Sequence, residues 1–499
     1  MPPPNGAMAG ITQARASGSI SREALVGLDV GTTGVKALAI SPEGRLLART
    51  EEKYTLSIPR PGWAEQDPED WWQASRRALA RLGVEPLAIG LSGQMHGLVC
   101  LDHRDRVLRP AILWNDQRTV AECADIERDL GLERLVAMTG NRALPGFTAP
   151  KLLWLKRHEP ESYVRIASIL LPKDYVRLRL TREHATDVSD ASGTLLFDVA
   201  QRTWSRDLLQ RLEIRSDWLP PALESHMLSG YTHAGIPVAA GAGDQAAAAL
   251  GVGIVRPGRL SLVLGTSGVV FAALPSFVVD PTARLHVFCH AVPATWHAMG
   301  VMLSAAGSLR WLRDTMGRSY EELLAAAETW PPGAGGLAFA PYLMGERTPH
   351  ADADVRGAFV GLDLRHDCGA LTRALLEGVA FGLRDSLELM RSLGISPTVA
   401  RVSGGGARSD LWIQIVASVL GLRVEHMAVE EGSALGAALL GGIAAGVFAG
   451  ADEAVERCEE VGTTVEPEPT WRDRYDELYE RFKTLYPILR PLAQASGSP

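Results

Sequence analysis

The sequence predicts an α/β protein made of two related domains, each built around a largely parallel sheet, with a ligand cleft between them. Short apolar, β-branched runs alternate with amphipathic stretches of helical period, which is typical of a parallel sheet covered by helices. One motif also occurs twice, as LDVGTTGV at residues 28–35 and as LVLGTSGV at residues 262–269. A repeat at this separation indicates two domains of the same design.

The first elements follow one another in a clear order. Residues 1–23 are rich in Pro, Gly, Ser and Ala and have few large apolar side chains, so we expect a disordered extension. Residues 24–40 contain two apolar runs joined by a glycine turn and predict a hairpin, which a further turn joins to a third strand. Residues 69–82 predict an amphipathic helix, and residues 87–93 predict a short buried strand that ends in a turn.

A turn at Pro257 and Gly258 marks the predicted boundary between the domains. We therefore expect an N-terminal domain over residues 24–255 and a C-terminal domain over residues 256–490. The last part of the second domain is charged and helical in pattern, and residues 491–499 predict a flexible tail.

The composition disfavours several classes of protein. Fifty Lys and Arg residues against 58 Asp and Glu residues give a net charge of −8, which is unlike the basic surface of a nucleic-acid-binding protein. No apolar run approaches the ~18 residues of a membrane-spanning helix. The five cysteines are far apart and form no CxxC pair, so neither a disulfide framework nor a structural zinc site is expected. A cytoplasmic location, where thiols stay reduced, fits this pattern.

The two repeated turns have the composition of phosphate-binding loops. A tight Gly-Thr-Thr-Gly turn exposes several backbone N–H groups, and threonine hydroxyl groups add further donors. A single turn of this kind also closes ordinary hairpins, whereas two turns in corresponding places favour a phosphoanhydride chain held from both sides. The candidate residues are Gly31, Thr32 and Thr33 in the first turn and Gly265, Thr266 and Ser267 in the second.

The first turn differs from the second by an acidic residue. Asp29 lies two residues before Gly31, whereas Val263 takes the corresponding position before Gly265. An acid at the end of a buried strand is costly unless it has a partner, so we expect Asp29 to face the cleft and to hold Mg²⁺ through water. The alternative is an aspartate that only caps the turn.

A second candidate carboxylate follows another glycine turn. Asp244 comes after an apolar strand and the sequence Gly241-Ala242-Gly243, and it precedes an alanine-rich helix. This position faces the crevice where α/β folds bind ligands, and the helix N-terminus is expected to keep the group ionised. Such a carboxylate can orient or accept the proton of a sugar hydroxyl that attacks a γ-phosphoryl group. As an alternative, Asp244 serves only as a helix N-cap.

Further turns carry groups suited to a nucleoside and to a sugar. Three glycines between a strand and a helix, at residues 404–406, let a flat ring or a ribose lie against the backbone, and this turn is not the dinucleotide motif GxGxxG. Residues 94–97 (QMHG) and 114–118 (WNDQR) supply amides, an imidazole, a carboxylate and an aromatic face for a polyhydroxylated ligand. His96 alone is equally compatible with a loop histidine that has an internal partner. The segment GERTPH at residues 345–350 is polar, and its sequence alone implies no chemistry.

These segments together resemble the FGGY family of carbohydrate kinases, which belongs to the actin-like ATPases. The resemblance runs from about residue 25 to residue 489, with many distinctive segments in the order typical of the family. They are DVGTTGVK, WAEQDPEDWW, GQMHG, RPAILWND, PGFTAPKLLW, LPKDYVRLRL, LSLVLGTSG, PYLMGERTPH and SGGGARSD. The resemblance implies two actin-like (ribonuclease H-like) domains with a central ligand cleft, and a kinase that uses ATP, Mg²⁺ and a sugar.

Within the family, QMHG with WND and LPKD favours phosphorylation of D-xylulose at O5 over that of glycerol, gluconate or ribulose. By the resemblance, Asp244 matches the proton acceptor and Asp29 the acid near Mg²⁺ and ATP. Family members are commonly dimers, so a homodimer is also expected. The expected sugar contacts are Gln94, Met95, His96, Trp114, Asp116 and Gln245. The expected ATP contacts are Gly31, Thr32, Thr33, Lys36, Gly265, Thr266, Ser267, Gly405, Gly406 and Asp410.

Two positions depart from the pattern of the family. Gln245 stands where members that act on xylulose often have Asn, which weakens the expected preference for a pentulose. Ala370 stands where a polar residue is common, on a helix expected to lie away from the chemistry. Two other functions stay open. One is a kinase for another pentulose or a polyol, and the other is a non-catalytic member of the actin-like group that binds ATP as a conformational switch.

Overall fold

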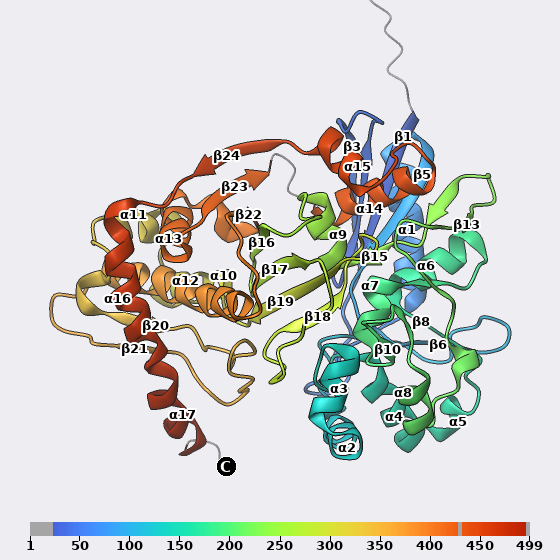
Figure 1. Ribbon diagram of the computed structural model, residues 1–499, viewed down its shortest axis with the longest axis horizontal. Helices are drawn as coiled ribbons and strands as arrows, with labels where there is room; N and C mark the ends of the chain where they lie inside the picture. Colours follow the sequence, from blue (N-terminus) through green and yellow to red (C-terminus); the bar gives the residue numbers. More distant parts are fainter. Residues whose placement is uncertain (1–22, 428–431, 496–499) are drawn as a thin grey trace, which may run out of the picture.

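The computed structural model describes residues 23–427 and 432–495 and arranges them in two lobes (Figure 1). Each lobe contains a seven-stranded sheet covered by helices, so the predicted α/β architecture of two related domains is confirmed. The expected disordered extension lies outside the described residues except for Glu23, which is the first residue of a strand.

The first sheet has the strand order β13-β14-β5-β1-β2-β3, with β15 paired to β5. Its central strand β1 is antiparallel to β2 and parallel to β5. The first repeated motif forms the turn between β1 and β2, which confirms the predicted hairpin. The strands are β1 (Glu23–Val30), β2 (Gly34–Ile40), β3 (Leu46–Lys53), β5 (Glu85–Gly93), β13 (Leu228–Tyr231), β14 (Pro237–Ala239) and β15 (Ala242–Gly243).

The second sheet repeats this plan in the order β18-β19-β17-β16-β22-β23-β24. Its strand β16 is antiparallel to β17 and parallel to β22, and the second repeated motif forms the turn between β16 and β17. Each sheet therefore contains one copy of the motif at its centre. The strands are β16 (Arg259–Leu264), β17 (Gly268–Leu274), β18 (His286–Cys289), β19 (Trp296–Met302), β22 (Val399–Ser403), β23 (Arg423–Met427) and β24 (Val461–Val465).

Two helices cover one face of the first sheet. Helix α1 (Pro68–Leu82) starts after Asp67, whose side chain accepts a hydrogen bond from the Glu69 N–H group, and it ends at Gly83 with a left-handed φ of 67°. Its apolar stripe packs on β2 and β3, and α6 (Pro172–Thr181) lies beside it against β5. This is the amphipathic helix that the sequence predicts.

The opposite face is covered by α9 (Asp244–Gly251) and by α14 (Gly432–Ala444), a helix from the C-terminal part of the chain (Figure 1). The backbone of α14 lies directly on the sheet, since a Cβ atom added to Gly27 would sit 1.8 Å from the Ala434 carbonyl oxygen. Apolar side chains of α14 share one core with β1, β2 and α9. The two lobes are thus joined by more than the segment near residue 255.

The core of the second lobe gathers around α12 (Cys368–Ser392), which packs on β17 and β19 and on α13 (Asp410–Leu420). Ala370 is fully buried in this core. The other helices of this lobe are α10 (Ala306–Met316), α11 (Tyr320–Glu328), α16 (Arg472–Lys483) and α17 (Leu485–Ala495).

The last helix of the described chain, α17, extends into the expected flexible tail. The expected flexible tail starts at residue 491, whereas α17 continues to Ala495. Leu485 is buried, and the Tyr486 ring stacks on His350 with ring centroids 3.5 Å apart. These contacts fix the first turn of α17, and the helix propagates from there. The rest of the expected tail lies outside the described residues.

A mainly helical layer of the first lobe follows β5 in the sequence. Its apolar cluster also contains Phe288 of β18 and Val301 of β19, so this layer contacts the second lobe. Its helices include α2 (Val120–Leu130), α3 (Leu132–Thr139), α4 (Thr148–His158), α5 (Pro160–Tyr163) and α8 (Arg206–Arg211), and α15 (Ala451–Cys458) follows α14. Short strand pairs complete the fold: β4 (Glu65–Gln66) with β7 (Ala111–Ile112), β6 (Val99–Leu101) with β8 (Ser168–Leu170), β9 (Thr186–Asp187) with β12 (Ala222–Leu223), β10 (Phe197–Asp198) with β11 (Thr203–Trp204), and β20 (Ala338–Ala340) with β21 (Ala358–Val360).

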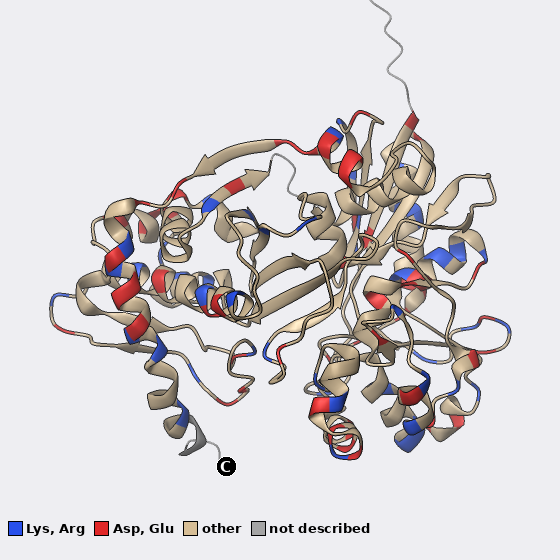
Figure 2. Cartoon of the chain, viewed as in Figure 1, with Lys and Arg blue, Asp and Glu red and all other residues tan. Residues whose placement is uncertain are grey.

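Acidic and basic side chains are interleaved along helices such as α16 (Figure 2). No helix in the described ranges is both long enough and apolar enough to span a bilayer. Four of the five cysteines are buried as small side chains, namely Cys100, Cys123, Cys289 and Cys458.

Candidate active site

Three neighbouring strands of the first sheet end at one edge and bring two acidic residues together. Strands β1 and β15 flank β5, so that Asp29 pairs with Ser92 and Gly243 pairs with Gly93. Asp244 follows Gly243 directly as the first residue of α9. The two acids that the sequence singles out in separate motifs therefore share one site, where their charges interact.

Asp244 has the surroundings of a proton acceptor. Gly243 occupies the N-cap position of α9, so the alternative role of Asp244 as an N-cap is not what the structure shows. Burial, followed by the negative charge of Asp29, raises the pKa of Asp244 to about 7. The expectation that the helix N-terminus keeps this group ionised is only partly met, because the loss of solvation outweighs the helix dipole. A carboxylate whose pKa lies near the working pH accepts a proton efficiently.

Asp29 has a free oxygen. It is half-buried, and its Oδ1 atom is buried without a hydrogen-bond partner. Burial raises the pKa of Asp29, and the Ser92 hydroxyl group on the neighbouring strand, followed by the exposed Lys36 across β1 and β2, opposes that shift. A turn-capping aspartate would use this oxygen on a backbone N–H group, so the structure disfavours that alternative. An unpartnered carboxylate oxygen fits Mg²⁺, which binds proteins through one or two carboxylates and retains several waters.

The first turn is held by side chains that the sequence assigns to the sugar. The Gln94 amide group donates to the Gly31 carbonyl oxygen (3.4 Å) and accepts a hydrogen bond from the Thr32 hydroxyl group (3.2 Å). The Trp114 indole N–H group donates to the same Thr32 hydroxyl oxygen (3.0 Å), and Thr33 is exposed beside it. Gln94 is only 2% exposed, so in this structure it shapes the phosphate turn. Trp114 is 41% exposed and leaves its ring available to a ligand.

Asp116 also differs from its predicted role. Its carboxylate accepts hydrogen bonds from the Ala64 N–H group (2.6 Å) and, at both oxygens, from the Arg118 guanidinium group (2.9 and 2.7 Å). Asp116 is fully buried, so it fixes the loop after β7 and presents no free oxygen to a sugar. The motif specifies the residue type but not the groups that its oxygens bind.

Met95 and His96 follow β5 and remain candidates for the sugar. A Cβ atom added to Gly243 would lie 2.8 Å from Met95 Cγ, so Met95 packs against that turn. His96 has a left-handed φ of 66°, a strained conformation that clusters at functional sites. Its Nδ1 atom lies 2.6 Å from the Gly193 carbonyl oxygen, and burial followed by the charge of Lys151 lowers its pKa to about 3. The neutral ring therefore donates from Nδ1 and offers Nε2 as an acceptor.

Lys151 is a residue of the site for which the sequence motif specifies no contact. It is fully buried in α4, and its ammonium group donates to the carbonyl oxygens of His96 (2.8 Å) and Gly146 (2.7 Å). The Thr148 hydroxyl group also donates to the His96 carbonyl oxygen (3.1 Å). These two donors hold the strained backbone of His96. The segment PGFTAPKLLW contains both residues, but their partner is fixed only by the fold.

A buried ionic cluster lies behind the turn that precedes Asp244. The Lys173 ammonium group contacts three carboxylates, at 2.7 Å from Asp174, 2.8 Å from Asp187 and 3.1 Å from Asp190. Arg177 also contacts Asp174 (3.2 Å), and all five side chains are fully buried. Burial alone would lower the pKa of Lys173, but the three carboxylates raise it. Burial raises the pKa of Asp190 well above its usual range, and the charge of Lys173 opposes that shift.

The cluster is linked to the backbone next to Asp244. The Ser189 hydroxyl group, on α7 (Val188–Ala191), donates to Asp187 (2.5 Å) and accepts a hydrogen bond from the Gly243 N–H group (3.1 Å). The ionic cluster therefore fixes the turn that positions the carboxylate. The segment LPKD contains the lysine of this network, whereas Asp187 and Ser189 come from a region that no motif marks.

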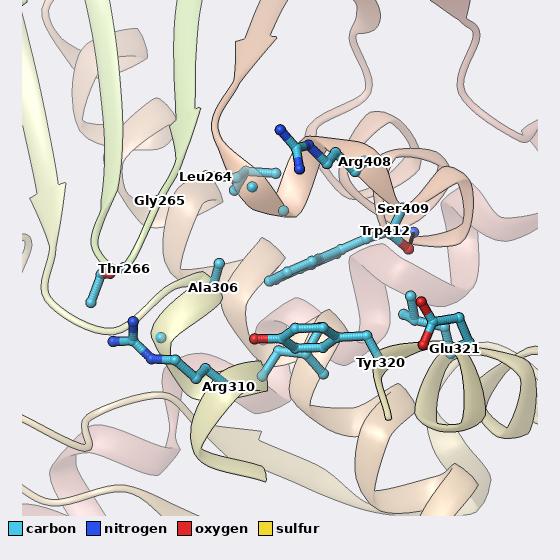
Figure 3. Close-up of a pocket in the computed structure, with 15 residues that line it drawn as sticks. Leu264, Gly265, Thr266, Ala306, Arg310, Tyr320, Glu321, Arg408, Ser409 and Trp412 are labelled. Carbon is cyan, nitrogen blue, oxygen red and sulfur yellow. Dashed lines mark hydrogen bonds between the residues drawn. The ribbon is translucent and has the colours of Figure 1, made fainter. Parts of the chain in front are cut away.

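The second repeated turn borders a cavity of 640 Å³ in the second lobe (Figure 3). Gly265 and Thr266 line this cavity together with Gly405 and Gly406. The structure thus brings the second phosphate turn and the predicted nucleoside platform to one pocket, whose volume is typical of sites for small ligands. Ser267 completes the turn and is half-buried.

Further side chains that line this cavity include Arg310, Tyr320 and Trp412, which no quoted motif contains, and Arg408, which belongs to SGGGARSD. Arg310 lies with Thr266 at one end, and the rings of Tyr320 and Trp412 extend into the same cavity (Figure 3). Arg310 belongs to α10, which begins soon after the buried strand β19 ends. In the sequence, this order of a buried strand followed by a helix is the signal that could have indicated Arg310.

Asp410 does not lie where the resemblance implies. It is the first residue of α13 and is exposed, and it is not among the residues that line the cavity. Ser409 lines the cavity and also caps α13, because its hydroxyl oxygen accepts a hydrogen bond from the Trp412 N–H group (3.2 Å). The helix start thus turns the Asp410 side chain toward solvent.

Comparisons with known proteins agree with this geometry. The N-terminal domain of the FGGY family of carbohydrate kinases matches residues 24–251, and the C-terminal domain of that family matches residues 260–445. The chain is 46% identical over 436 residues to the xylulose kinase of Escherichia coli (strain K12), which covers 84% of this chain and 90% of that protein. It is 39% identical over 493 residues to the xylulose kinase of Bacillus subtilis (strain 168), which covers 95% of this chain and 99% of that protein. The crystal structure of the xylulose kinase from Rhodospirillum rubrum matches with a TM-score of 0.88 at 35% identity, over 94% of this chain and 100% of that chain. The chain therefore belongs to the FGGY family of carbohydrate kinases.

Proposed function

We propose that the protein transfers the γ-phosphoryl group of ATP to O5 of D-xylulose and releases D-xylulose 5-phosphate and ADP. The observation that carries this proposal is the pair Asp29 and Asp244 at one edge of the first sheet, with a free oxygen on the first and a raised pKa on the second. The similar proteins of E. coli, B. subtilis and R. rubrum are named xylulose kinases, which favours D-xylulose as the acceptor.

Asp244 acts on the attacking hydroxyl group. Its ionised form accepts a hydrogen bond from the O5–H group and aims that oxygen at the γ-phosphorus atom, and it takes the proton as the new P–O bond forms. Because the transition state of phosphoryl transfer is loose, positioning contributes more than early removal of the proton. Water can take the place of O5 when the sugar is absent, so slow hydrolysis of ATP is expected under those conditions.

The sugar is held by groups of the first lobe. The Nε2 atom of His96 accepts a hydrogen bond from a sugar hydroxyl group, and Met95 packs beside it. The exposed ring of Trp114 offers an apolar face to the carbon chain. Gln245 is half-buried next to Asp244 and stays a predicted sugar contact.

The nucleotide is held by the two turns and by the cavity of the second lobe. Backbone N–H groups at residues 31–33 and 265–267 bind phosphate oxygens, and Gly405 and Gly406 border the space for the nucleoside. Asp29, with its unpartnered Oδ1 atom, would hold Mg²⁺. When bound, Mg²⁺ would offset the negative charge that the phosphates share in the transition state.

An assay of ADP release over a panel of pentuloses, polyols and glycerol tests the proposed substrate. We expect kcat/KM to be highest with D-xylulose, by about tenfold or more over sugars that differ in one hydroxyl group. A higher value with another pentulose or a polyol would identify the alternative kinase activity. Turnover of no sugar, with nucleotide binding intact, would favour the non-catalytic ATP switch.

Replacement of Asp29 with alanine tests the proposed Mg²⁺ site. A carboxylate that holds a metal through water typically contributes about 10- to 100-fold to metal affinity, so the Mg²⁺ concentration for half-maximal activity should rise by that factor. The exposed Asp217, whose side chain is 63% accessible, provides a matched aspartate-to-alanine control. An Asp29→Ala enzyme with the metal response of the control would remove Asp29 from this role.

We also propose that the functional domains span residues 24–255 and 256–490 and that the enzyme works as a homodimer in the cytoplasm. The resemblance to the family supports the domains and the dimer, and the spacing of the cysteines supports the location.

A further inference from the structure

The segment GERTPH, to which the sequence assigns no chemistry, is clamped against the end of β19. The Glu346 carboxylate accepts hydrogen bonds from the N–H groups of Leu303 (2.9 Å) and Arg347 (2.8 Å). The Thr348 hydroxyl oxygen accepts a hydrogen bond from the Val301 N–H group (3.0 Å). Glu346 and Thr348 are both buried, so the residues on either side of Arg347 are fixed.

The Arg347 guanidinium group has no hydrogen-bond acceptor among the described residues, although the charge of the adjacent Glu346 acts on it. The Arg347 side chain is half-buried and forms no hydrogen bond or ion pair with any residue in the described ranges. Other buried arginines of this lobe are paired, as Arg373 is with Glu377 (2.7 Å) and Arg401 with Glu425 (3.1 Å). A partly desolvated guanidinium group without an acceptor is costly, and its N–H donors are available to a ligand.

Arg347 lies near the sugar-binding end of the first lobe. The Thr348 hydroxyl group, next to Arg347, donates to the carbonyl oxygen of Arg284 (2.9 Å), two residues before His286. The rings of Phe147 and His286 lie with their centroids 6.1 Å apart. Burial is the main cause of the lowered pKa values of His96 and His286, and the charge of Arg347 adds a smaller contribution at both rings. The Nδ1 atom of His286 lies 2.7 Å from Asn141 Oδ1, and Phe147 packs edge-on against His96 with ring centroids 4.7 Å apart. Residues of both lobes therefore meet around His96 and Arg347.

The order of groups along the site indicates which end of the sugar meets Arg347. Met95 packs on the turn that leads into Asp244, and His96 follows Met95 in the chain. Asp244 lies beside Asp29 at the edge of the first sheet, whereas His96 contacts Phe147, whose ring contacts His286 near the segment of Arg347. A linear sugar with its reacting hydroxyl group at Asp244 would therefore extend past His96 toward Arg347.

We propose that Arg347 binds the C1–C2 end of the ketose, donating paired hydrogen bonds to the C2 carbonyl oxygen and the C1 hydroxyl oxygen, and thereby selects for 1-hydroxy ketoses. This inference rests on the proposed transfer to O5, because O5 at Asp244 places C1 and C2 at the far end. A guanidinium group presents a planar fork of donors and no acceptor, which matches two neighbouring oxygens of which the carbonyl can only accept. The second lobe thus binds the end of the sugar that is remote from the phosphorylated hydroxyl group.

The test compares Arg347→Met with the wild type on D-xylulose, on 1-deoxy-D-xylulose, which lacks the C1 hydroxyl group, and on xylitol, which lacks the carbonyl group. We expect kcat/KM for D-xylulose to fall by about 10- to 100-fold, mainly through KM, since hydrogen bonds from a charged group are lost. The two analogues should lose less, so the selectivity for D-xylulose shrinks. The KM for ATP and the slow hydrolysis of ATP without sugar should stay nearly unchanged.

Two further variants control for charge and for folding. Arg347→Lys retains the charge without the planar fork and should recover only part of the selectivity. Arg318→Met, at an arginine of the same lobe whose side chain is 58% exposed, should leave every parameter unchanged. The thermal unfolding midpoint of each variant shows whether a loss of activity comes from a loss of fold.

Unchanged selectivity in Arg347→Met would overturn the proposal. A raised KM for ATP with loss of sugar-free hydrolysis would place Arg347 at the phosphates instead, and an equal loss on all three sugars would leave it a structural role. Failure of the proposed function appears separately, as a wild-type enzyme that prefers another substrate. In that case the same comparison, made with that substrate and its analogues altered at the end remote from the reacting hydroxyl group, decides the role of Arg347.

Discussion

The Asp244→Asn enzyme is expected to lose a factor of about 10² to 10⁴ in kcat for sugar phosphorylation, which is the usual contribution of a positioned proton acceptor. The amide has nearly the shape of the carboxylate, but it cannot take up the O5 proton. The nucleotide cavity lies in the other lobe, so the Kd of a non-hydrolysable ATP analogue, measured by calorimetry, should be nearly that of the wild type.

The pH dependence of this variant isolates the titration of Asp244. In the wild type, kcat/KM should fall as the pH is lowered through about 7, because protonation removes the acceptor, and the residual activity of the variant should lack this step. The pKa of about 7 in the folded protein lies above the ordinary value of 3.8. The loss of folding stability caused by ionisation of Asp244 is therefore absent below about pH 4, increases as the pH rises to about 7 and stays at its full value above pH 7. We accordingly expect the unfolding midpoint of the variant, relative to that of the wild type, to rise between about pH 4 and pH 7 and to stay higher above pH 7.

The matched control is Asp217→Asn, at a surface aspartate whose side chain is 63% exposed. It should retain wild-type kcat and the wild-type pH profile. Full activity of Asp244→Asn would show that another group accepts the proton, and an unchanged pH profile in that variant would assign the step near pH 7 to a different residue.

The second large effect is expected on stability, in Lys173→Met. This substitution removes the cation that lies within 3.1 Å of three buried carboxylates and leaves Arg177, which contacts Asp174, as the remaining cation of the cluster. Removing one member of a buried ionic group typically costs about 3–5 kcal/mol, because the other charges stay desolvated without a partner. The free energy of unfolding, measured by urea denaturation, should fall by that amount, and kcat should fall as well because the cluster anchors the Gly243 N–H group through Ser189.

The comparison for this variant is Lys156→Met, which removes a surface lysine whose side chain is 40% exposed and which pairs with Glu213 at 2.5 Å. Exposed ion pairs contribute about 0–1 kcal/mol, so the urea midpoint of this control should change little. If Lys173→Met were as stable as the control, the buried cluster would not stabilise the fold, and its role as an anchor for the catalytic turn would have to be abandoned.

The parts of the fold that the sequence predicts are those that depend on neighbouring residues. The hairpins β1–β2 and β16–β17 follow from apolar runs and glycine turns that lie within 20 residues of each other. The helix α1 follows from its own periodicity and caps. Asp29 and Asp244 are found for the same reason, since each lies beside a glycine turn at the end of a strand.

The parts that sequence patterns do not predict depend on contacts between distant segments. Gln94 and Asp116 have the residue types of sugar contacts, yet their polar atoms bind Thr32 and the Ala64 N–H group, which only the folded chain brings near. The partners of Lys173 come from α6, β9 and α7. The pKa of Asp244 depends on burial and on Asp29, 215 positions earlier in the chain, and neither is visible in the local motif.

The position of α14 has a consequence for how the chain folds as it is synthesised. The face of the first sheet that contains Leu25 and Leu38 is covered by Leu435 and Leu439 of α14, and these residues leave the ribosome only after most of the second lobe. The N-terminal lobe therefore emerges with one apolar face uncovered and cannot reach its final core until the polypeptide is nearly complete. Long-range pairing of this kind slows folding and prolongs the exposure of apolar surface, so nascent chains of this protein are expected to depend on chaperones more than a chain whose lobes fold one after the other.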